Sequence, residues 1–283
     1  MIFITTGAGK VGQHVVTQLA QKKVPARAGF RTQDKAAALK APGIEGVVVD
    51  FESRESLAAA FRGIDTLFLV TAGAPEQAHQ EENILAEAKK ASVKRIVKLS
   101  GKISARHTTG FSVWNREAER RIKDTGIPYT ILRGNTFMQN FLFRAAQIKQ
   151  GAFTLGPGHL RQAFIDARDI AATAVAALTE EGHAGKTYEV NGPQALDGPG
   201  TAAAFSSALG RPIQYLDVSV DDYCKRLTSM GMPDWMVESV RVVASEDNRD
   251  RGDQSSADTD RVLRRKLNTL EEFVKEHRAA FQP

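Results

Sequence analysis

The chain has 283 residues, of which 42% are hydrophobic and 25% charged, and its formal net charge is +5. This composition is that of an ordinary globular protein, with room for one large domain or for one domain and a smaller appendage. No apolar run is long enough to cross a bilayer. We therefore expect a cytoplasmic protein with no membrane partner.

Metal and nucleic-acid binding find little support in the sequence. The single cysteine, Cys224, excludes an internal disulfide, and the six histidines show no ligand spacing. The densest basic cluster, residues 261–266, directly follows Asp258 and Asp260. A solvated helix face explains this cluster at least as well as nucleic-acid contact, so we expect no metal and no nucleic-acid partner.

The first two-thirds of the chain alternates short β-branched runs with amphipathic helical segments, the pattern of βαβ units in a parallel sheet. The strands are expected at Ile2–Thr5, Ala26–Phe30, Gly46–Val49, Thr66–Val70, Arg95–Leu99, Tyr129–Leu132 and Thr187–Val190. The helices are expected at Val11–Gln21, Ser56–Arg62, Gln77–Ala91, Trp114–Thr125 and Arg168–Leu178, the last with Asp166 as its cap.

The pattern changes after about Pro193, where glycine and proline cluster and mostly helical segments follow, with one short strand at Ile213–Leu216. We predict a Rossmann-type, doubly wound α/β domain with a smaller, helix-rich C-terminal subdomain. Residues 1–151 and 163–192 form the first, and residues 152–162 and 193–283 form the second. Because ligands of doubly wound sheets bind outside the carboxyl ends of the strands, we expect the subdomain to cover the substrate.

The loop Gly7-Ala8-Gly9-Lys10-Val11-Gly12 has the G-x-G-x-x-G pattern of dinucleotide-binding proteins. It follows the first strand and opens the first helix, which is the setting that the motif requires. Its glycines allow the backbone to approach a pyrophosphate, and the helix N-terminus adds a favourable field. A glycine-rich turn without a ligand is the alternative.

The end of the second strand distinguishes the two nicotinamide cofactors, because an acid there binds the ribose of NAD and an arginine accommodates the 2′-phosphate of NADP. Arg31 stands at this place, and Asp34 comes three residues too late. With Lys10 and Lys35 nearby, Arg31 favours NADP(H) over NAD(H), although a solvated surface arginine is the alternative. Asp50 and Phe51 follow the third strand, where adenine is expected; a helix cap is a competing role for Asp50.

Several further motifs point to one known family: Thr6–Gly12, Val48–Asp50, Lys98–Ser100, Ile127–Arg133 and Thr179–Tyr188. They resemble the NmrA-like branch of the atypical short-chain dehydrogenases, and within it the NADPH-dependent quinone and triarylmethane-dye reductases. The resemblance extends over essentially the whole chain. It departs from the family pattern at Thr6, which stands where the loop normally has its first glycine, and at Arg133-Gly134, where Arg-Pro is usual.

The resemblance implies a set of cofactor contacts that follow the strands in turn. Gly7, Gly9, Lys10, Val11 and Gly12, with Thr6 before them, would hold the pyrophosphate, Arg31 the 2′-phosphate, and Asp50 and Phe51 the adenine. Val70, Thr71 and Ala72 would line the ribose and nicotinamide, Ser100 and Gly101 would face the nicotinamide, and Asn135, Thr136 and Phe137 would close over its ring.

The usual proton-donating pair of short-chain dehydrogenases is missing. Its tyrosine and lysine positions fall on Phe111 and Asn115, which can neither transfer a proton nor supply positive charge. Only the serine-like position, Ser100, keeps a hydroxyl. We therefore do not expect alcohol oxidation or ketone reduction by the usual route.

Two hypotheses remain. In the first, the protein is a reductase that passes hydride to a quinone-like or dye-like aromatic electrophile, for which position and an apolar pocket suffice. In the second, it binds NADP(H) without catalysis and reports the redox state to a protein partner. We expect a monomer or a homodimer.

Under the first hypothesis the chain offers candidates for the pocket and the chemistry. Asn115 or Asn140 would bond a quinone oxygen, and His107 would relay a proton. Aromatic and thioether side chains would line the pocket, with core packing as the alternative for each: Trp114, Phe137, Met138, Phe141 and Trp235.

Overall fold

A computed structural model describes residues 1–103, 110–156, 160–245 and 257–283. The chain divides into two compact units. The first consists of Met1–Ile103, Phe111–Arg133 and Ile170–Tyr188, and the second consists chiefly of Gly134–Asp169 and Glu189–Pro283.

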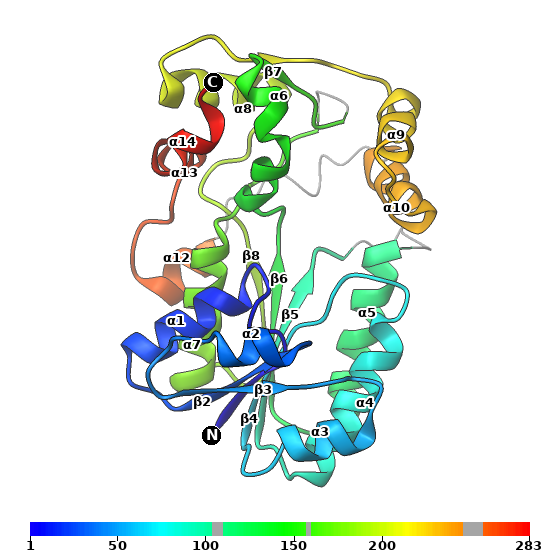
Figure 1. The fold of residues 1–283 in the computed structure, drawn as a ribbon, viewed down its shortest axis with the longest axis vertical. Coiled ribbons are helices and arrows are strands. Elements are labelled where there is room, and N and C mark those ends of the chain that lie inside the picture. Colours follow the sequence, from blue (N-terminus) through cyan, green and yellow to red (C-terminus); the bar gives the residue numbers. More distant parts are fainter. Residues whose placement is uncertain (104–109, 157–159, 246–256) are drawn as a thin grey trace. The chain divides into compact units, whose positions relative to one another are not determined.

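The first unit is built on a seven-stranded sheet of order β3-β2-β1-β4-β5-β6-β8, and the pairs β2–β3, β1–β2, β1–β4 and β4–β5 run parallel. Helices α1 and α7 lie on one face of the sheet, and α3, α4 and α5 lie on the other (Figure 1). The strands are β1 (Ile2–Ile4), β2 (Ala26–Phe30), β3 (Ile44–Val48), β4 (Thr66–Leu69), β5 (Arg95–Gly101), β6 (Tyr129–Gly134) and β8 (Lys186–Val190). The helices are α1 (Gly12–Gln21), α2 (Gln33–Ala37), α3 (Arg54–Ala60), α4 (Gln77–Lys90), α5 (Gly110–Asp124) and α7 (Ala167–Thr179).

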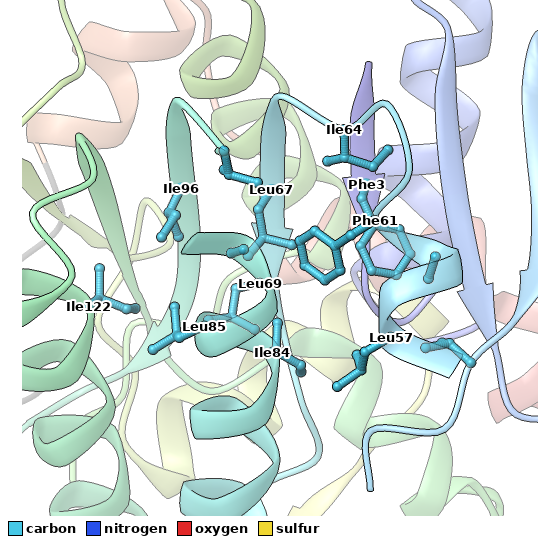
Figure 2. Packing of buried hydrophobic residues seen from close by; sticks show 14 residues of the cluster. Phe3, Leu57, Phe61, Ile64, Leu67, Leu69, Ile84, Leu85, Ile96 and Ile122 are labelled. Carbon is cyan, nitrogen blue, oxygen red and sulfur yellow. The ribbon is translucent and has the colours of Figure 1, made fainter. Parts of the chain in front are cut away.

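The predicted Rossmann-type sheet is confirmed, and each of its strands was expected within a few residues of its place. Alternate residues of the strands face the layer under α3 and α4, where they form a buried cluster (Figure 2). Phe3 of β1 meets Phe61 edge-to-face, with ring centroids 5.2 Å apart. Leu67 and Leu69 of β4 extend this cluster, and both are fully buried.

The second unit has its own core of phenylalanines. Phe141 meets the rings of Phe153, Phe164 and Phe205 at centroid distances of 5.0–6.2 Å. The elements of this unit are η1 (Met138–Arg144), α6 (Ala145–Lys149), β7 (Ala152–Phe153), α8 (Gly198–Leu209), β9 (Gln214–Tyr215), α9 (Val220–Ser229), α10 (Asp234–Ser245), α12 (Ala257–Leu263), α13 (Leu270–Glu276) and α14 (Arg278–Phe281).

The division differs from the predicted domain boundary at residue 151. Residues 134–151 belong to the second unit because Met138, Phe141 and Ile148 pack in its core. In sequence these residues follow a Rossmann strand directly, so their apolar pattern suits either unit.

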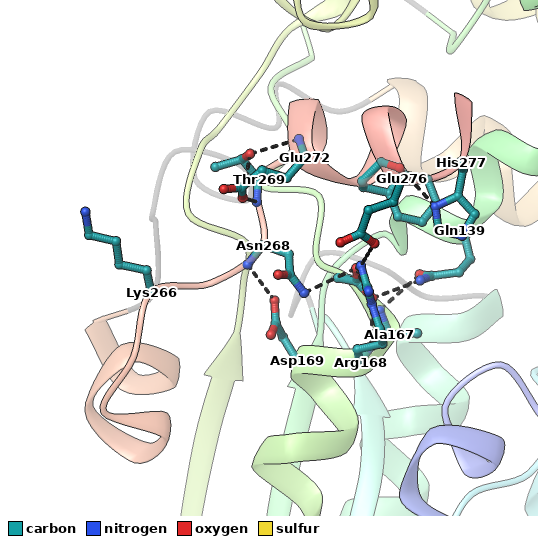
Figure 3. Close-up of polar contacts among 12 residues, drawn as sticks. Gln139, Ala167, Arg168, Asp169, Lys266, Asn268, Thr269, Glu272, Glu276 and His277 are labelled. Atoms are coloured by element: carbon teal, nitrogen blue, oxygen red, sulfur yellow. Dashed lines mark hydrogen bonds and ion pairs between the residues drawn. The ribbon is translucent and has the colours of Figure 1, made fainter. Parts of the chain in front are cut away.

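A buried polar cluster in the second unit ties the C-terminal helices to the start of α7 (Figure 3). Arg168 donates to the Asp166 carboxylate from Nη2 at 2.6 Å and reaches Glu276 at the same distance. The Asp169 carboxylate accepts from Arg265 at 2.6 Å and from the backbone N–H of Asn268 at 2.9 Å. These bonds link residues 166–169, the part of the α7 region that belongs to the second unit, to the segment that leads into α13.

The two buried aspartates of this cluster respond differently to their surroundings. Burial by itself would raise the pKa of Asp166, but hydrogen bonds from Arg168 and Gln139 outweigh it and the pKa is lowered. For Asp169, burial dominates over the bonds from Asn268 and Arg265, and the pKa is raised. The ionised form of Asp166 therefore stabilises the folded state.

We predict that Asp166→Asn lowers the free energy of unfolding near pH 7 by about 1.5–3 kcal/mol, because it removes a charge-assisted acceptor. A carboxylate whose pKa is lowered on folding stabilises the protein at pH values above its ordinary pKa of 3.8. This stabilisation is lost as the pH falls through the lowered pKa of the folded state. The difference between wild type and variant should therefore shrink below about pH 4. Chemical denaturation across this pH range measures it, with the exposed Asp260→Asn as control. A difference that stays constant with pH would contradict the assignment.

Candidate active site

The Thr6–Gly12 loop leaves the carboxyl end of β1, between β2 and β4, where the order of strands reverses. A Cβ on Gly12 would lie 1.8 Å from the Thr6 carbonyl oxygen, and one on Gly7 would lie 2.8 Å from the Phe30 ring. Both positions therefore require glycine for lack of space. The loop is therefore packed closely against the sheet at the start of α1, a setting that fits a pyrophosphate.

Positive charge gathers around this loop. Lys10, Arg31 and Lys35 are exposed, and they follow β1 and β2 at the same edge of the sheet. Among the described residues no carboxylate pairs with Arg31 or Lys35. The first turn of α1 carries no acid either. The residues present therefore fit the 2′-phosphate of NADP(H), as the sequence predicts.

Asp50 lies exposed after β3 and does not cap the following helix, so that competing role was wrong. Its Oδ1 accepts the backbone N–H of Glu52 at 2.9 Å. The cap of α3 is Ser53, whose hydroxyl accepts from the backbone N–H of Ser56 at 3.2 Å. Asp50 keeps an exposed carboxylate where adenine is predicted to lie.

One face of β5 changes from apolar to polar along the strand. Ile96, Lys98 and Ser100 share the face toward α4 and α5, since alternate residues point the same way. Ile96 lies in the apolar cluster, whereas Lys98 and Ser100 each reach a buried carboxylate. The polar part therefore lies at the carboxyl end of the strand.

Ser100 donates its hydroxyl to Oε1 of Glu119 at 2.8 Å. Arg133 holds the same carboxylate from Nε at 3.0 Å and from Nη2 at 2.7 Å. A hydroxyl has a single proton to donate, so in this arrangement Ser100 can accept a hydrogen bond from a ligand but cannot give one.

Lys98 and Glu81 form a buried ion pair, with Nζ 2.8 Å from Oε1 and side chains 2% and 0% exposed. Glu81 Oε1 also accepts from the Thr71 hydroxyl at 2.5 Å and from Nε2 of Gln77 at 3.2 Å. The other carboxylate oxygen, Oε2, is buried without a partner. The bond to Glu81 thereby fixes the side chain of Thr71, which is predicted to line the nicotinamide.

Asn115 joins this network from α5. Its Oδ1 accepts from Nε2 of Gln77 at 3.4 Å. Its Nδ2 lies beside Gly101, where an added Cβ would be 2.9 Å away. Asn115 therefore lies at the carboxyl end of β5, as its predicted role requires.

Phe111 and Trp114, one turn or less before Asn115, form an aromatic pair with centroids 5.6 Å apart. A Cβ on Gly73 would lie 2.8 Å from the Phe111 ring. The position usual for the proton-donating tyrosine therefore carries an apolar ring packed against the loop after β4. His107 lies outside the described residues.

Phe51, Val70 and Ala72 belong to the first unit, where Phe51 packs against the apolar cluster and Val70 donates its backbone N–H to the Thr5 hydroxyl. A further group of predicted residues belongs to the second unit. Asn135 donates to Asn191 at 3.0 Å and accepts the backbone N–H of Thr136 at 2.8 Å, and Phe137 forms a parallel bridge with Ile165. Met138 and Phe141 are 1% exposed and lie in the phenylalanine core. Their described contacts are those of core residues, which favours core packing over a place in the pocket. Asn140 and Trp235 are half-buried.

Sequence reasoning did not single out Gln77, Glu81, Glu119 or Arg133 as parts of the site. A buried charged or polar residue leaves no local signal, because its partner lies elsewhere in the chain. One hint was available, since Lys98 interrupts the apolar run of residues 96–99.

In the parts of the chain that the structure describes, none of the helices combines the length and apolarity needed to cross a bilayer. The same residues bring together no group of three side chains suited to a metal ion.

The seven-stranded sheet, with its glycine loop where the strand order reverses, defines a Rossmann-type dinucleotide-binding protein. Residues 1–274 match the NmrA-like family, and the chain belongs to it. The predicted family is thus confirmed.

Three known proteins show the range of this likeness. The chain is 35% identical over 284 residues to a protein named NAD(P)H azoreductase from Xenophilus azovorans, covering 99% of each. The structure of Citrobacter sp. triphenylmethane reductase complexed with NADP(H) superposes with a TM-score of 0.86 at 26% identity, covering 98% of this chain and 99% of that one. The NADPH-dependent quinone oxidoreductase QOR2 of Escherichia coli, complexed with NADPH, gives 0.88 at 29% identity with the same coverage.

We predict that Lys98→Met lowers the free energy of unfolding by about 3–5 kcal/mol, because it leaves the Glu81 carboxylate buried without a compensating charge. The double variant Lys98→Met with Glu81→Leu should recover much of this loss, since the charge is then removed as well. Denaturant unfolding measures both, with the exposed Lys94→Met as control. The Glu81→Leu single variant completes the comparison. If the loss of unfolding free energy in the double variant equals the sum of the losses in the two single variants, the pairing is contradicted.

Proposed function

We propose that the protein is an NADPH-dependent reductase that acts on quinone-like or dye-like aromatic electrophiles, azo compounds included. The observation that carries this proposal is the likeness, over 99% of both chains, to a protein named NAD(P)H azoreductase. The glycine loop, the exposed cations beside it and the apolar ring of Phe111 support it from the structure.

Different residues of the site bind different parts of NADPH. The loop from Gly7 to Gly12 offers its backbone N–H groups to the pyrophosphate, and Arg31 offers its guanidinium to the 2′-phosphate. Arg31 forms charge-assisted bonds that NADH cannot make, because NADH lacks that phosphate. When bound, NADPH supplies the hydride.

The acceptor determines what else the protein must provide. A quinone and NADPH, with one proton, give a hydroquinone and NADP⁺. Because the acceptor is already electrophilic, its reduced oxygen can take the proton from water, and no acidic side chain is needed at the Phe111 position. The chain has to hold the acceptor in place and stabilise the oxygen on which charge develops. We assign the second task to the Asn115 amide.

The first experiment combines calorimetry with NADPH and NADH and an assay of NADPH oxidation against a panel of quinones, azo dyes and triarylmethane dyes. Selective NADPH binding with turnover of at least one acceptor class would support the reductase. Binding without turnover across the panel would overturn it in favour of a non-catalytic redox sensor with a protein partner. Failure to bind either nucleotide would overturn both.

We predict that Arg31→Asp raises the Kd for NADPH by about tenfold or more, since a charge-assisted bond is replaced by repulsion. The Kd for NADH should change much less. Calorimetry of both nucleotides tests this, with Arg62→Asp, another exposed arginine of the first unit, as control. Equal NADPH affinity in Arg31→Asp and wild type would refute the cofactor assignment.

We also predict that Asn115→Ala lowers kcat for a quinone by about tenfold, the loss expected when a hydrogen bond to a developing charge is removed. The Kd for NADPH should stay unchanged. Asn140→Ala, measured in parallel, separates the two candidate amides. If only Asn140→Ala slows turnover, the role belongs to Asn140.

A further inference from the structure

We propose that Gln77 and Glu81 are positioning residues, which fix the Asn115 amide with its nitrogen facing the reacting oxygen of the acceptor. This inference rests on the proposed function, and it adds to the site two residues that do not touch the substrate. Its basis is a chain of hydrogen bonds in which each partner determines the orientation of the next.

The chain begins at Glu81, whose carboxylate can only accept. Lys98 Nζ lies 2.8 Å from its Oε1 and supplies the opposite charge. Gln77 is 3% exposed and approaches the same oxygen at 3.2 Å. Because an amide oxygen would be repelled there, Gln77 must turn its nitrogen toward Glu81.

The second proton on Gln77 Nε2 then determines the orientation of Asn115. It points to the Asn115 side chain, so the atom that meets it, 3.4 Å away, must be the oxygen Oδ1. The nitrogen Nδ2 of Asn115 is left on the opposite side, beside Gly101 at the end of β5. Among the residues that the structure describes, no acceptor takes the Nδ2 protons.

The orientation matters because the two ends of an amide have opposite effects on a developing negative charge. The nitrogen of Asn115 donates and stabilises an oxygen that gains charge as hydride arrives, whereas the amide oxygen would repel it. An unrestrained asparagine would sample both orientations. The network removes this freedom before the substrate binds.

The burial of the network argues against a purely structural role. Replacing a buried ion pair by apolar residues of similar volume is often neutral or stabilising, so Lys98 and Glu81 are weak evidence for stability. Glu81 Oε2 is buried without a partner, which adds a further cost. A fixed orientation of the Asn115 amide explains why the hydrogen-bond acceptor Glu81 and the donor Gln77 follow one another in this chain of bonds.

A double-mutant cycle between Gln77 and Asn115 tests the proposal. Gln77→Met keeps the volume and leaves the Lys98–Glu81 pair intact, so it should fold. With menadione and NADPH as substrates, Gln77→Met should lower kcat by about tenfold while the KM for NADPH stays unchanged. In the Asn115→Ala background the same substitution should cause a loss of less than about twofold, because no amide remains to be oriented. Gln80→Met, a matched change on the same helix, should have no effect.

Two further variants test the direction of the effect. Glu81→Gln replaces an obligate acceptor by a group that can present either end, and should slow turnover only when Asn115 is present. Asn115→Asp places acceptor oxygens at the site, and should be slower than Asn115→Ala. Failure of Glu81→Gln to fold leaves the Gln77 cycle as the deciding test.

The outcomes separate this inference from the proposed function. A wild-type protein that does not reduce menadione or any other acceptor overturns the proposed function. If the wild type is active and the losses from Gln77→Met and Asn115→Ala multiply in the double variant, Gln77 acts independently of Asn115. The positioning role is then refuted and the reductase stands.

Discussion

The parallel pairing of β1 with both β2 and β4 is the constraint on which the rest of the first unit depends. Parallel strands end at one edge, so the loops that follow them gather there whatever their separation in sequence. The glycine loop after β1 and Arg31 after β2 are neighbours for this reason alone. Gly12 adds the close contact of α1 with the Thr6 carbonyl, which sets where the helix begins.

The same edge collects the buried polar groups. The layer between the sheet and helices α4 and α5 is apolar around Ile84 and Ile96, and becomes polar toward the strand ends. Two carboxylates are buried there, and each has its own cation: Lys98 for Glu81 and Arg133 for Glu119. Since unpaired buried charges are strongly destabilising, this pairing allows polar groups to lie directly beneath the predicted nicotinamide position.

Local signals in the sequence were sufficient for the strands, the glycine loop and Arg31, because periodicity and glycine spacing act over a few residues. The network under Asn115 could not be predicted in that way. Two of its bonds join residues 17 and 38 positions apart, and only the packing of α4 and α5 on the same face of the sheet makes them neighbours. The observed division differs from the predicted domain boundary for a similar reason, since Met138 and Phe141 are equally suited to a pocket and to a core until their partners are known.

On one face of α5, Phe111 and Asn115 stand where short-chain dehydrogenases usually have a tyrosine and a lysine. These two replacements are enough to change the chemistry that this fold supports. With Phe111 packed against Gly73, the site offers no acidic proton where short-chain dehydrogenases usually keep one. With Asn115 in place of a lysine, it offers a neutral donor instead of a charge, and a neutral amide, unlike a lysine, must be oriented to be useful. The glycine loop and Arg31, on the far side of β4, are untouched by either change. Binding of the pyrophosphate and 2′-phosphate is therefore physically separable from acceptor choice in this protein, and the orienting network belongs to the second.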